Sequence, residues 1–252
     1  MRVSLFAFAC LSIALSSSLS ATTIVGVWTK KQVTIAADSK QTFIQDGQII
    51  PSRSQTGCKI FEVRHLVVAL AGLAQSEEIS VVDAITNSKE LFDQDTHVKL
   101  PLESVVVGAE SAVARILTAR HATSDRNGSV ALIVAGVVNG VLQMYRIENW
   151  GMQMAGDYSM PMAARRIEYP RDRGHNGSDP NRGIETIGID DSIKRYQDVL
   201  PEWSAGGDVS VARRLVAVEA ADSRDSAFVG PPISTVIVTK KGIRWINKGA
   251  CE

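Results

Sequence analysis

The residues best suited to chemistry are a threonine, an aspartate and a lysine that lie at the ends of expected strands. Thr22 opens the first strand, Asp38 follows the second, and Lys59 stands at the start of the third. As the first residue of a mature chain, Thr22 would carry a hydroxyl and a free α-amine on adjacent carbons, which are a nucleophile and a base in one residue. Each residue alone also has an ordinary interpretation, because threonine favours strands, aspartate favours turns and lysine often protects a strand edge.

The residues ahead of Thr22 have the layout of a cleavable signal peptide. Arg2 supplies a positive charge, residues 3–15 are apolar, and residues 16–21 (SSSLSA) are mostly small and polar. This order of a charged, an apolar and a small-residue region is typical of secretory leaders. We therefore expect residues 1–21 to be removed and the mature protein to be secreted or periplasmic.

Two cleavage points are open. A cut after Ala21 would make Thr22 the N-terminus, but it places Leu19 where signal peptidase prefers a small residue. A cut after Ser18 fits that preference better and would leave three residues ahead of the threonine, so that its amine would be blocked.

Hydrophobic patterning predicts short strands joined in hairpins. The strands are expected at residues 23–28, 33–37, 60–63, 66–70, 130–138, 141–147 and 234–238, the last of which closes the chain. Asn139-Gly140, between two of these runs, is the strongest short-range signal for a hairpin.

Helical patterns follow the strand pairs. Helices are expected to begin at residues 76–78 and to cover residues 102–117 and 208–222. Residues 71–74 indicate a break after a strand, and residues 149–182 indicate a long surface excursion without periodicity. This order of elements fits two packed sheets with helices outside.

Composition excludes several classes of function. The chain has 252 residues, 45% of them hydrophobic, which is enough for one sizeable core, and its 27 basic residues balance 27 acidic ones. This balance gives no reason to expect a nucleic-acid or anionic-membrane partner, and no apolar run beyond the leader approaches a membrane span. The histidines lack metal-ligand spacing, and we expect no cofactor. Once the leader with Cys10 is removed, Cys58 and Cys251 could form a bridge in an oxidising compartment, although two isolated cysteines do not define a disulfide framework.

Several blocks of the chain resemble those of proteasome β-type subunits. Residues 22–27 (TTIVGV), 36–40 (AADSK), 57–61 (GCKIF) and 70–74 (LAGLA) match in the family's order and at near-family spacing, and residues 224–227 (RDSA) resemble a later segment. The chain is thus similar to threonine peptidases among the N-terminal-nucleophile (Ntn) hydrolases. The resemblance implies an α+β fold, a four-layer αββα sandwich with two antiparallel sheets between helix layers, as a single domain over residues 22–252.

The resemblance also implies a role for each matching residue. Thr22 matches the nucleophile, Lys59 the lysine beside its amine, and Asp38 the carboxylate that pairs with this lysine. Gly72 matches the backbone N–H that holds the oxyanion, and Asp225 matches a further acid near the threonine.

Four more positions match the family's substrate-binding residues. The backbone of Thr42 would pair with an extended substrate, whereas Gln41, Leu70 and Ala74 would line the primary pocket. A leucine with a small alanine suggests a medium-sized apolar side chain in that pocket, since no acid is placed there to pair with a basic one.

The chain departs from the family pattern in some places. Ala21 stands where the family has glycine before the threonine, residues 187–190 (IGID) lack the hydroxyl of the family's Gly-Ser-Gly block, and Phe228 stands near an expected serine. The segment between Ser39 and Lys59 is also longer than in typical members.

These observations lead to one expected function and two alternatives. We expect a secreted threonine hydrolase that cleaves peptide (amide) bonds through an acyl-ester on Thr22, with peptides or unfolded proteins as substrates. The alternatives are a catalytically silent binding or assembly subunit and a small-molecule amidase of the same superfamily, because a fold does not fix a substrate. A homo-oligomer is possible, and ring assembly is left open.

Overall fold

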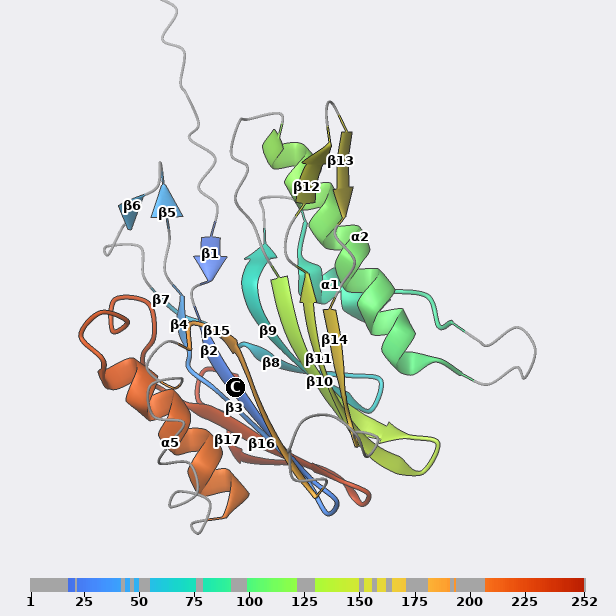
Figure 1. The fold of residues 1–252 in the computed structure, drawn as a ribbon, viewed down its shortest axis with the longest axis vertical. Helices are drawn as coiled ribbons and strands as arrows, with labels where there is room; N and C mark the ends of the chain where they lie inside the picture. The colour runs from blue at the N-terminus through green and yellow to red at the C-terminus, as the bar shows by residue number, and fades with distance from the viewer. Residues whose placement is uncertain are drawn as a thin grey trace, which may run out of the picture.

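The chain is an α+β protein in which antiparallel sheets pack against helices (Figure 1). The computed structural model describes residues 18–20, 22–41, 44–45, 48–49, 55–75, 79–91, 99–121, 130–149, 152–155, 158–161, 165–170, 181–190, 193 and 207–251. Most of the expected leader and Thr42 lie outside these residues.

The first sheet is built around the strand that begins just after Thr22. In order across the sheet its strands are β15 (Arg182–Gly188), β2 (Thr23–Thr29), β3 (Val33–Ala37), β16 (Ser234–Thr239) and β17 (Gly242–Asn247). All neighbours are antiparallel. Val25 and Val27 of β2 pack against helix α5 (Asp208–Ala221), whereas Ile24 and Trp28 face the second sheet. Because both faces of β2 are covered, its sequence reads as a continuous apolar run.

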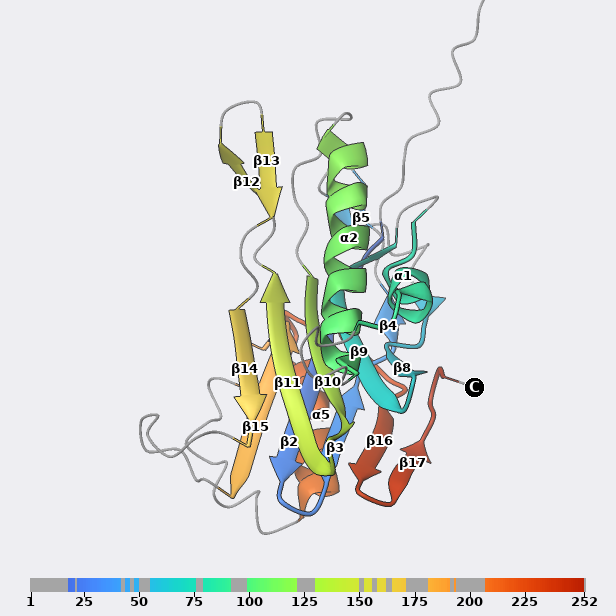
Figure 2. The same ribbon diagram turned by 90° about the vertical axis from the view of Figure 1, so that its right-hand side faces the viewer.

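The second sheet packs against the face of the first sheet that carries Ile24 and Trp28. Its strands, in order, are β1 (Ser18–Ser20), β9 (Leu66–Gln75), β10 (Val130–Val138), β11 (Val141–Asn149) and β14 (Arg165–Tyr169), and β8 (Ile60–Val63) also pairs with β9. Helices α1 (Val81–Asn87) and α2 (Pro101–His121) cover its far face (Figure 2). Alternate residues of β9 divide between the two sides, with Val68 and Leu70 under the helices and Val67 and Ala69 between the sheets.

Shorter strand pairs lie beside these sheets. They are β4 (Lys40–Gln41) with β7 (Gln55–Thr56), β5 (Ile44–Gln45) with β6 (Gln48–Ile49), and β12 (Met152–Ala155) with β13 (Tyr158–Pro161). The first two pairs occupy the long segment between Ser39 and Lys59.

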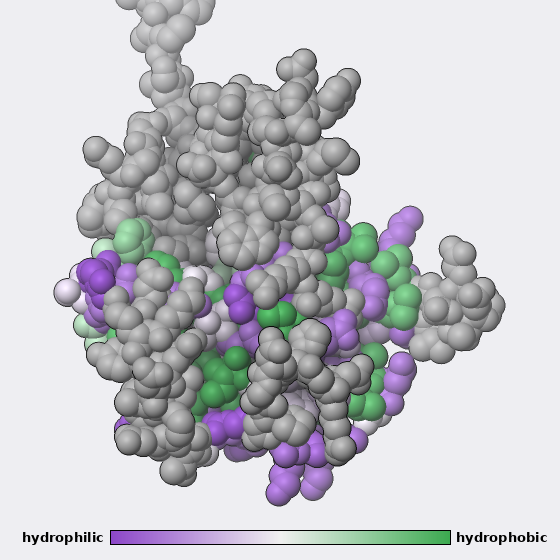
Figure 3. Space-filling model, in the orientation of Figure 1, coloured by the Kyte–Doolittle hydropathy of each residue, from purple (hydrophilic) through white to green (hydrophobic). Residues whose placement is uncertain are grey.

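The lower end of the first sheet is hydrophilic. Figure 3 shows purple residues at this end, where the turns from β2 to β3 and from β16 to β17 lie. These turns carry the exposed side chains of Lys30, Lys31, Lys240 and Lys241. Within the described part of the chain, no helix is both long and apolar enough to cross a membrane.

The hairpins and helices predicted from apolar patterns are largely confirmed. The two residues of the β10–β11 turn, Asn139 and Gly140, have φ values of 51° and 77°, as a two-residue hairpin turn with both central residues left-handed requires. Helices α2 and α5 begin within one residue of the expected positions. The expected helix start at residues 76–78 lies outside the described residues, and α1 begins at Val81 with Ser80 as its N-cap.

Three expectations about strands were wrong. Residues 71–74 do not break a strand, because β9 continues to Gln75, paired with β10 as far as Gly72 and with β1 from Gly72 to Gln75. Residues 149–182 are not only a surface excursion, because they contain β12, β13 and β14, and β14 extends the second sheet. Finally, β16 does not close the chain: it turns into β17.

Candidate active site

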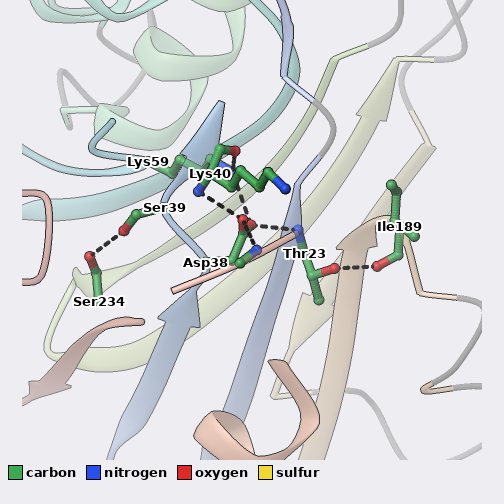
Figure 4. Close-up of polar contacts among 8 residues, drawn as sticks. Thr23, Asp38, Ser39, Lys40, Lys59, Ile189 and Ser234 are labelled. Carbon is green, nitrogen blue, oxygen red and sulfur yellow. Dashed lines mark hydrogen bonds and ion pairs between the residues drawn. The ribbon is translucent and has the colours of Figure 1, made fainter. Parts of the chain in front are cut away.

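Asp38 is the centre of a buried hydrogen-bond network at the end of β3 (Figure 4). Its side chain is inaccessible to solvent, and its Oδ1 accepts from the backbone N–H of Thr23 and from Nζ of Lys59, both at 2.9 Å. Its Oδ2 accepts from the N–H of Lys40 at 3.0 Å and of Gly230 at 3.1 Å. All four partners are donors, so the network is satisfied by the ionised carboxylate.

Lys59 is held at the same carboxylate oxygen that accepts from Thr23. Its Nζ also donates to the backbone carbonyl of Lys40 at 2.6 Å, and its side chain is only 2% exposed. Its backbone carbonyl accepts from the N–H of Leu70 at 3.0 Å, which fixes the start of β8 against β9.

Burial shifts the pKa values of Lys59 and Asp38 in opposite directions. It lowers the pKa of Lys59 below the ordinary value of 10.5, and the neighbouring Asp38 carboxylate opposes that shift. It raises the pKa of Asp38 above 3.8, and Lys59 with the backbone donors opposes that shift. A lysine in this setting gives up its proton at a lower pH than a lysine in water.

The backbone at Thr22 and Thr23 is clamped by the end of β15. The N–H of Ile189 donates to the Thr22 carbonyl at 2.7 Å, and the Thr23 hydroxyl donates to the Ile189 carbonyl at 2.6 Å. Gly188 has a φ of +88°, and a Cβ at this position would lie 1.8 Å from the Thr22 carbonyl oxygen. Only glycine allows this approach.

Residues 18–20 lie as a strand along the edge of β9. Ser20 is opposite Gly72, Leu19 is opposite Leu73, and Ser18 is opposite Gln75, with an irregularity after Ser18. Strand β1 also contacts β4. An extended peptide recognised by strand addition binds a sheet edge in this way.

The two remaining residues with expected catalytic roles lie on β9 and in the turn after α5. Gly72 has a φ of +93° and lies in register with Ser20 and with Val130. Asp225 is half-buried in the turn that follows α5, where its carbonyl accepts from the N–H of Phe228 at 2.8 Å. The same turn reaches the network, since the carbonyl of Ser226 accepts from Nζ of Lys40 at 2.6 Å.

The residues expected to line the primary pocket lie in different surroundings from one another. Leu70 is 3% exposed and packs in the core beneath α1 and α2. Gln41 is half-buried in β4, and its Oε1 accepts from Nε2 of Gln55 at 3.1 Å. Ala74 belongs to β9, and Thr42 lies outside the described residues.

Sequence reasoning missed the backbone donors of the network. Thr23, Lys40 and Gly230 act on Asp38 through N–H groups, which any residue except proline supplies. Lys40 also accepts from Lys59 through its carbonyl. Gly188 could have been found from the sequence, because a glycine within an apolar strand indicates that another backbone approaches closely.

Among the described residues, no group of three or more His, Cys, Asp or Glu side chains could hold a metal ion. The residues on this network offer the chemistry of a threonine, once its amine is free, beside a buried lysine–aspartate pair. Within the described part of the chain, Lys59 and Asp38 form a buried ion pair in this network.

Comparison with protein families gives one match. The family described as proteasome subunit matches residues 19–160, which is more than half of the 252 residues. The match includes Thr22, Asp38, Lys59 and Gly72 and ends before Asp225. A comparison with curated proteins finds no matching relative.

Proposed function

The chain belongs to the proteasome subunit family, and from this premise we propose that it is a threonine hydrolase that cleaves peptide (amide) bonds through Thr22. The proposal requires that the leader be cut after Ala21, so that Thr22 carries a free α-amine. The observation that carries it is the buried Asp38 carboxylate, which holds both the Thr23 N–H and Lys59 Nζ at 2.9 Å.

In the proposed reaction the Thr22 hydroxyl attacks the carbonyl carbon of the substrate amide. The α-amine of Thr22, directly or through a water molecule, takes the hydroxyl proton and passes it to the departing amine. The C–N bond breaks and leaves an acyl-ester on Thr22 Oγ. Water, deprotonated by the same α-amine, then hydrolyses this ester and regenerates the hydroxyl.

Lys59 keeps the base in its neutral form. An α-amino group has an ordinary pKa of ~7.7–8.0. A cationic Lys59 nearby lowers that pKa, because like charges disfavour the ammonium form. Asp38 fixes Lys59 in place and balances its charge in the buried site, since an unpaired buried cation would be costly.

The edge of β9 is the proposed substrate-binding edge. Residues 18–20 pair with it in the uncut chain, and an extended peptide would take their place after the leader leaves. Gly72 lies at this edge, and its backbone N–H is the proposed donor to the oxyanion, an interaction that can be worth ~2.7–4 kcal/mol. The proposed preference before the cut is a medium-sized apolar side chain, and its support is the resemblance that assigns Leu70 and Ala74 to the primary pocket.

The proposal extends to the whole protein. Residues 1–21 are a signal peptide, and residues 22–252 form one four-layer αββα domain, secreted or periplasmic. Three core clusters support this arrangement, one under α5, one between the sheets and one under α1 and α2. Since proteasome subunits generally form oligomeric rings, a homo-oligomer is part of the proposal.

One observation favours a second candidate, a catalytically silent subunit. Ile189 holds the backbone of Thr22 and Thr23, but its side chain lacks the hydroxyl that the family's Gly-Ser-Gly block supplies. In this case the protein would bind peptides or assembly partners without cleaving them.

Turnover of fluorogenic peptides by a chain that begins at Thr22 separates the two candidates. A hydrolase loses about 10⁴-fold or more in kcat when Thr22→Ala removes the nucleophile, because the hydroxyl, the α-amine and Lys59 act as one catalytic unit. Thr86→Ala is the matched control, since Thr86 is an exposed residue of α1 whose hydroxyl donates to the Val82 carbonyl of the same helix. Equal turnover by wild type and Thr22→Ala would exclude the hydrolase, and absence of turnover with a free Thr22 would favour the silent subunit.

A further inference from the structure

A disulfide bond joins the residue next to Lys59 to the C-terminal end of the chain. Cys58 and Cys251 are bonded across 193 residues of sequence, and their Cα atoms lie 4.5 Å apart. Cys58 directly precedes Lys59, so the bond acts on the backbone that carries the buried ammonium group.

The C-terminal segment is anchored on the first sheet. Ser234, at the start of β16, donates its hydroxyl to the Lys248 carbonyl at 2.7 Å. The N–H of Cys251 donates to the same carbonyl at 2.9 Å, and its Sγ lies 3.6 Å from Ser234 Oγ. Cys251 also packs against the core between the sheets.

The same serine connects this segment to the residue after Asp38. Since the Ser234 hydroxyl donates to Lys248, the hydroxyl of Ser39, 3.5 Å away, is the donor in the contact between the two serines. The Ser39 carbonyl accepts from the N–H of Gly57 at 2.8 Å. The segment that leads into Lys59 is therefore held by Ser39 through its backbone and by Cys251 through its side chain.

We propose that the Cys58–Cys251 disulfide is a positioning device for Lys59, which holds its ammonium group against Asp38 and so links activity to oxidation of the two cysteines. A buried ammonium group gains hydration if it swings into water, so the backbone that carries it must be restrained. On one side the restraint is the pairing of Lys59 with Leu70, and on the other it is Cys58. The inference rests on the proposed function, because it takes the role of Lys59 from there.

Reduction releases this restraint by a balanced exchange. Dithiothreitol attacks the S–S bond, is oxidised to its cyclic disulfide, and leaves the two cysteines as thiols. Once the leader with Cys10 is removed, these are the two cysteines of the chain. An enzyme with this dependence would work where disulfides persist.

The pH profile of kcat/KM separates positioning from general stabilisation. The variants are Cys58→Ser, Cys251→Ser and the double substitution, compared with reduced wild type. All four proteins should show the same loss of kcat/KM, about 10-fold near neutral pH. The acid limb of the profile should also shift to higher pH, because the Thr22 amine regains the proton affinity that Lys59 suppressed. Dithiothreitol should change none of the three variants further.

Gly140→Ala is the control for stability alone. It places a side chain at φ +77° in a distant turn and should lower the melting temperature without moving the pH profile. If the cysteine variants also melt earlier but keep the wild-type profile, the bond is merely structural and the proposal is overturned.

A second measurement does not depend on catalysis. Reductive methylation followed by mass spectrometry gives the labelling rate of Lys59, with exposed Lys30 as an internal reference. Reduction should accelerate labelling of Lys59 about 10-fold or more, as local opening exposes it, and leave Lys30 unchanged. A wild type that cleaves no peptide but shows this change would refute the hydrolase, and with it the link to activity, but would support the role of the disulfide in positioning Lys59. Equal protection of Lys59 in both redox states would overturn the inference.

Discussion

At the scale of single residues, Asp38 and Lys59 stabilise the fold only as a pair. Both side chains are buried, at 0% and 2% exposure, so each neutralises a charge that water cannot reach. Breaking a buried pair by removing one partner typically costs ~3–5 kcal/mol, whereas removing both leaves no unpaired charge.

A double-mutant cycle tests this coupling. Asp38→Asn and Lys59→Met should each lower the free energy of unfolding by ~3–5 kcal/mol, and the double variant should cost clearly less than the sum. Urea unfolding of the four proteins measures the coupling. Additive losses would mean that the two charges are stabilised independently of each other.

The pH dependence of kcat/KM follows from the same pair. On the acid side activity rises as the Thr22 amine loses its proton, at a pH below ~7.7–8.0 because Lys59 lowers that pKa. On the alkaline side activity falls as Lys59 loses its proton and with it the ion pair that fixes it to Asp38, at a pH below 10.5 because burial lowers its pKa. In Lys59→Met the acid limb should move up and the alkaline limb should vanish, and a profile with both limbs in place would argue against this role for Lys59.

The sequence predicts which side chains carry the chemistry, but it does not predict their backbone partners. Thr22, Asp38 and Lys59 stand out because their blocks keep a fixed order. The N–H groups of Thr23 and Gly230 that satisfy Asp38 have no residue signature, since every residue except proline carries one.

At the scale of elements, the end of β15 decides where Thr22 lies. Gly188→Ala should push a Cβ into the Thr22 carbonyl and adds a left-handed backbone cost of ~1–2 kcal/mol. A displacement of the nucleophile by a fraction of an ångström to one ångström can cost about 100-fold in rate. We expect that loss in peptide turnover.

Gly140→Ala is the matched comparison for this substitution. Its φ of +77° gives a similar backbone cost, but a Cβ there meets nothing within 4 Å. It should destabilise the protein without reducing turnover. Equal turnover by Gly188→Ala and Gly140→Ala would show that β15 does not position the nucleophile.

Strand β1 gives a prediction about maturation. A chain that begins at Leu19 keeps residues on the edge of β9 and holds the Thr22 nitrogen in a peptide bond, so it should be inactive. The active species should have the intact mass of a chain that begins at Thr22. A time course of mass and activity follows the two forms, and full activity with Leu19 at the N-terminus would contradict the prediction.

Strands buried on both faces were easier to predict than the others. β2 and β10 read as apolar runs because helices or sheets cover each side. In β14, Ile167 and Tyr169 contribute to the core and the other three residues are charged. Two apolar residues are too few for the sequence to identify a strand. Gly72 suggested a strand end, but pairing with β1 and β10 carries β9 through it.

At the scale of the whole molecule, the site is assembled from distant parts of the chain. Family resemblance located residues 22–74, whereas Gly188, Gly230 and Cys251 reach the same region only through the sheet order. The Cys58–Cys251 pairing could be suggested from the sequence as a possibility, but its place beside Lys59 depends on where β17 ends. Contacts of this separation follow from topology and not from local pattern.

The most direct test of the central claim is covalent capture of the nucleophile in the intact mature chain. A peptide β-lactone acylates a reactive hydroxyl as its ring opens, and intact mass with peptide mapping locates the adduct. We predict one adduct on Thr22 in wild type and in Thr22→Ser, which keeps both hydroxyl and amine, and none in Thr22→Ala. A chain that begins at Thr22, is folded, and carries no adduct on that residue would contradict the account.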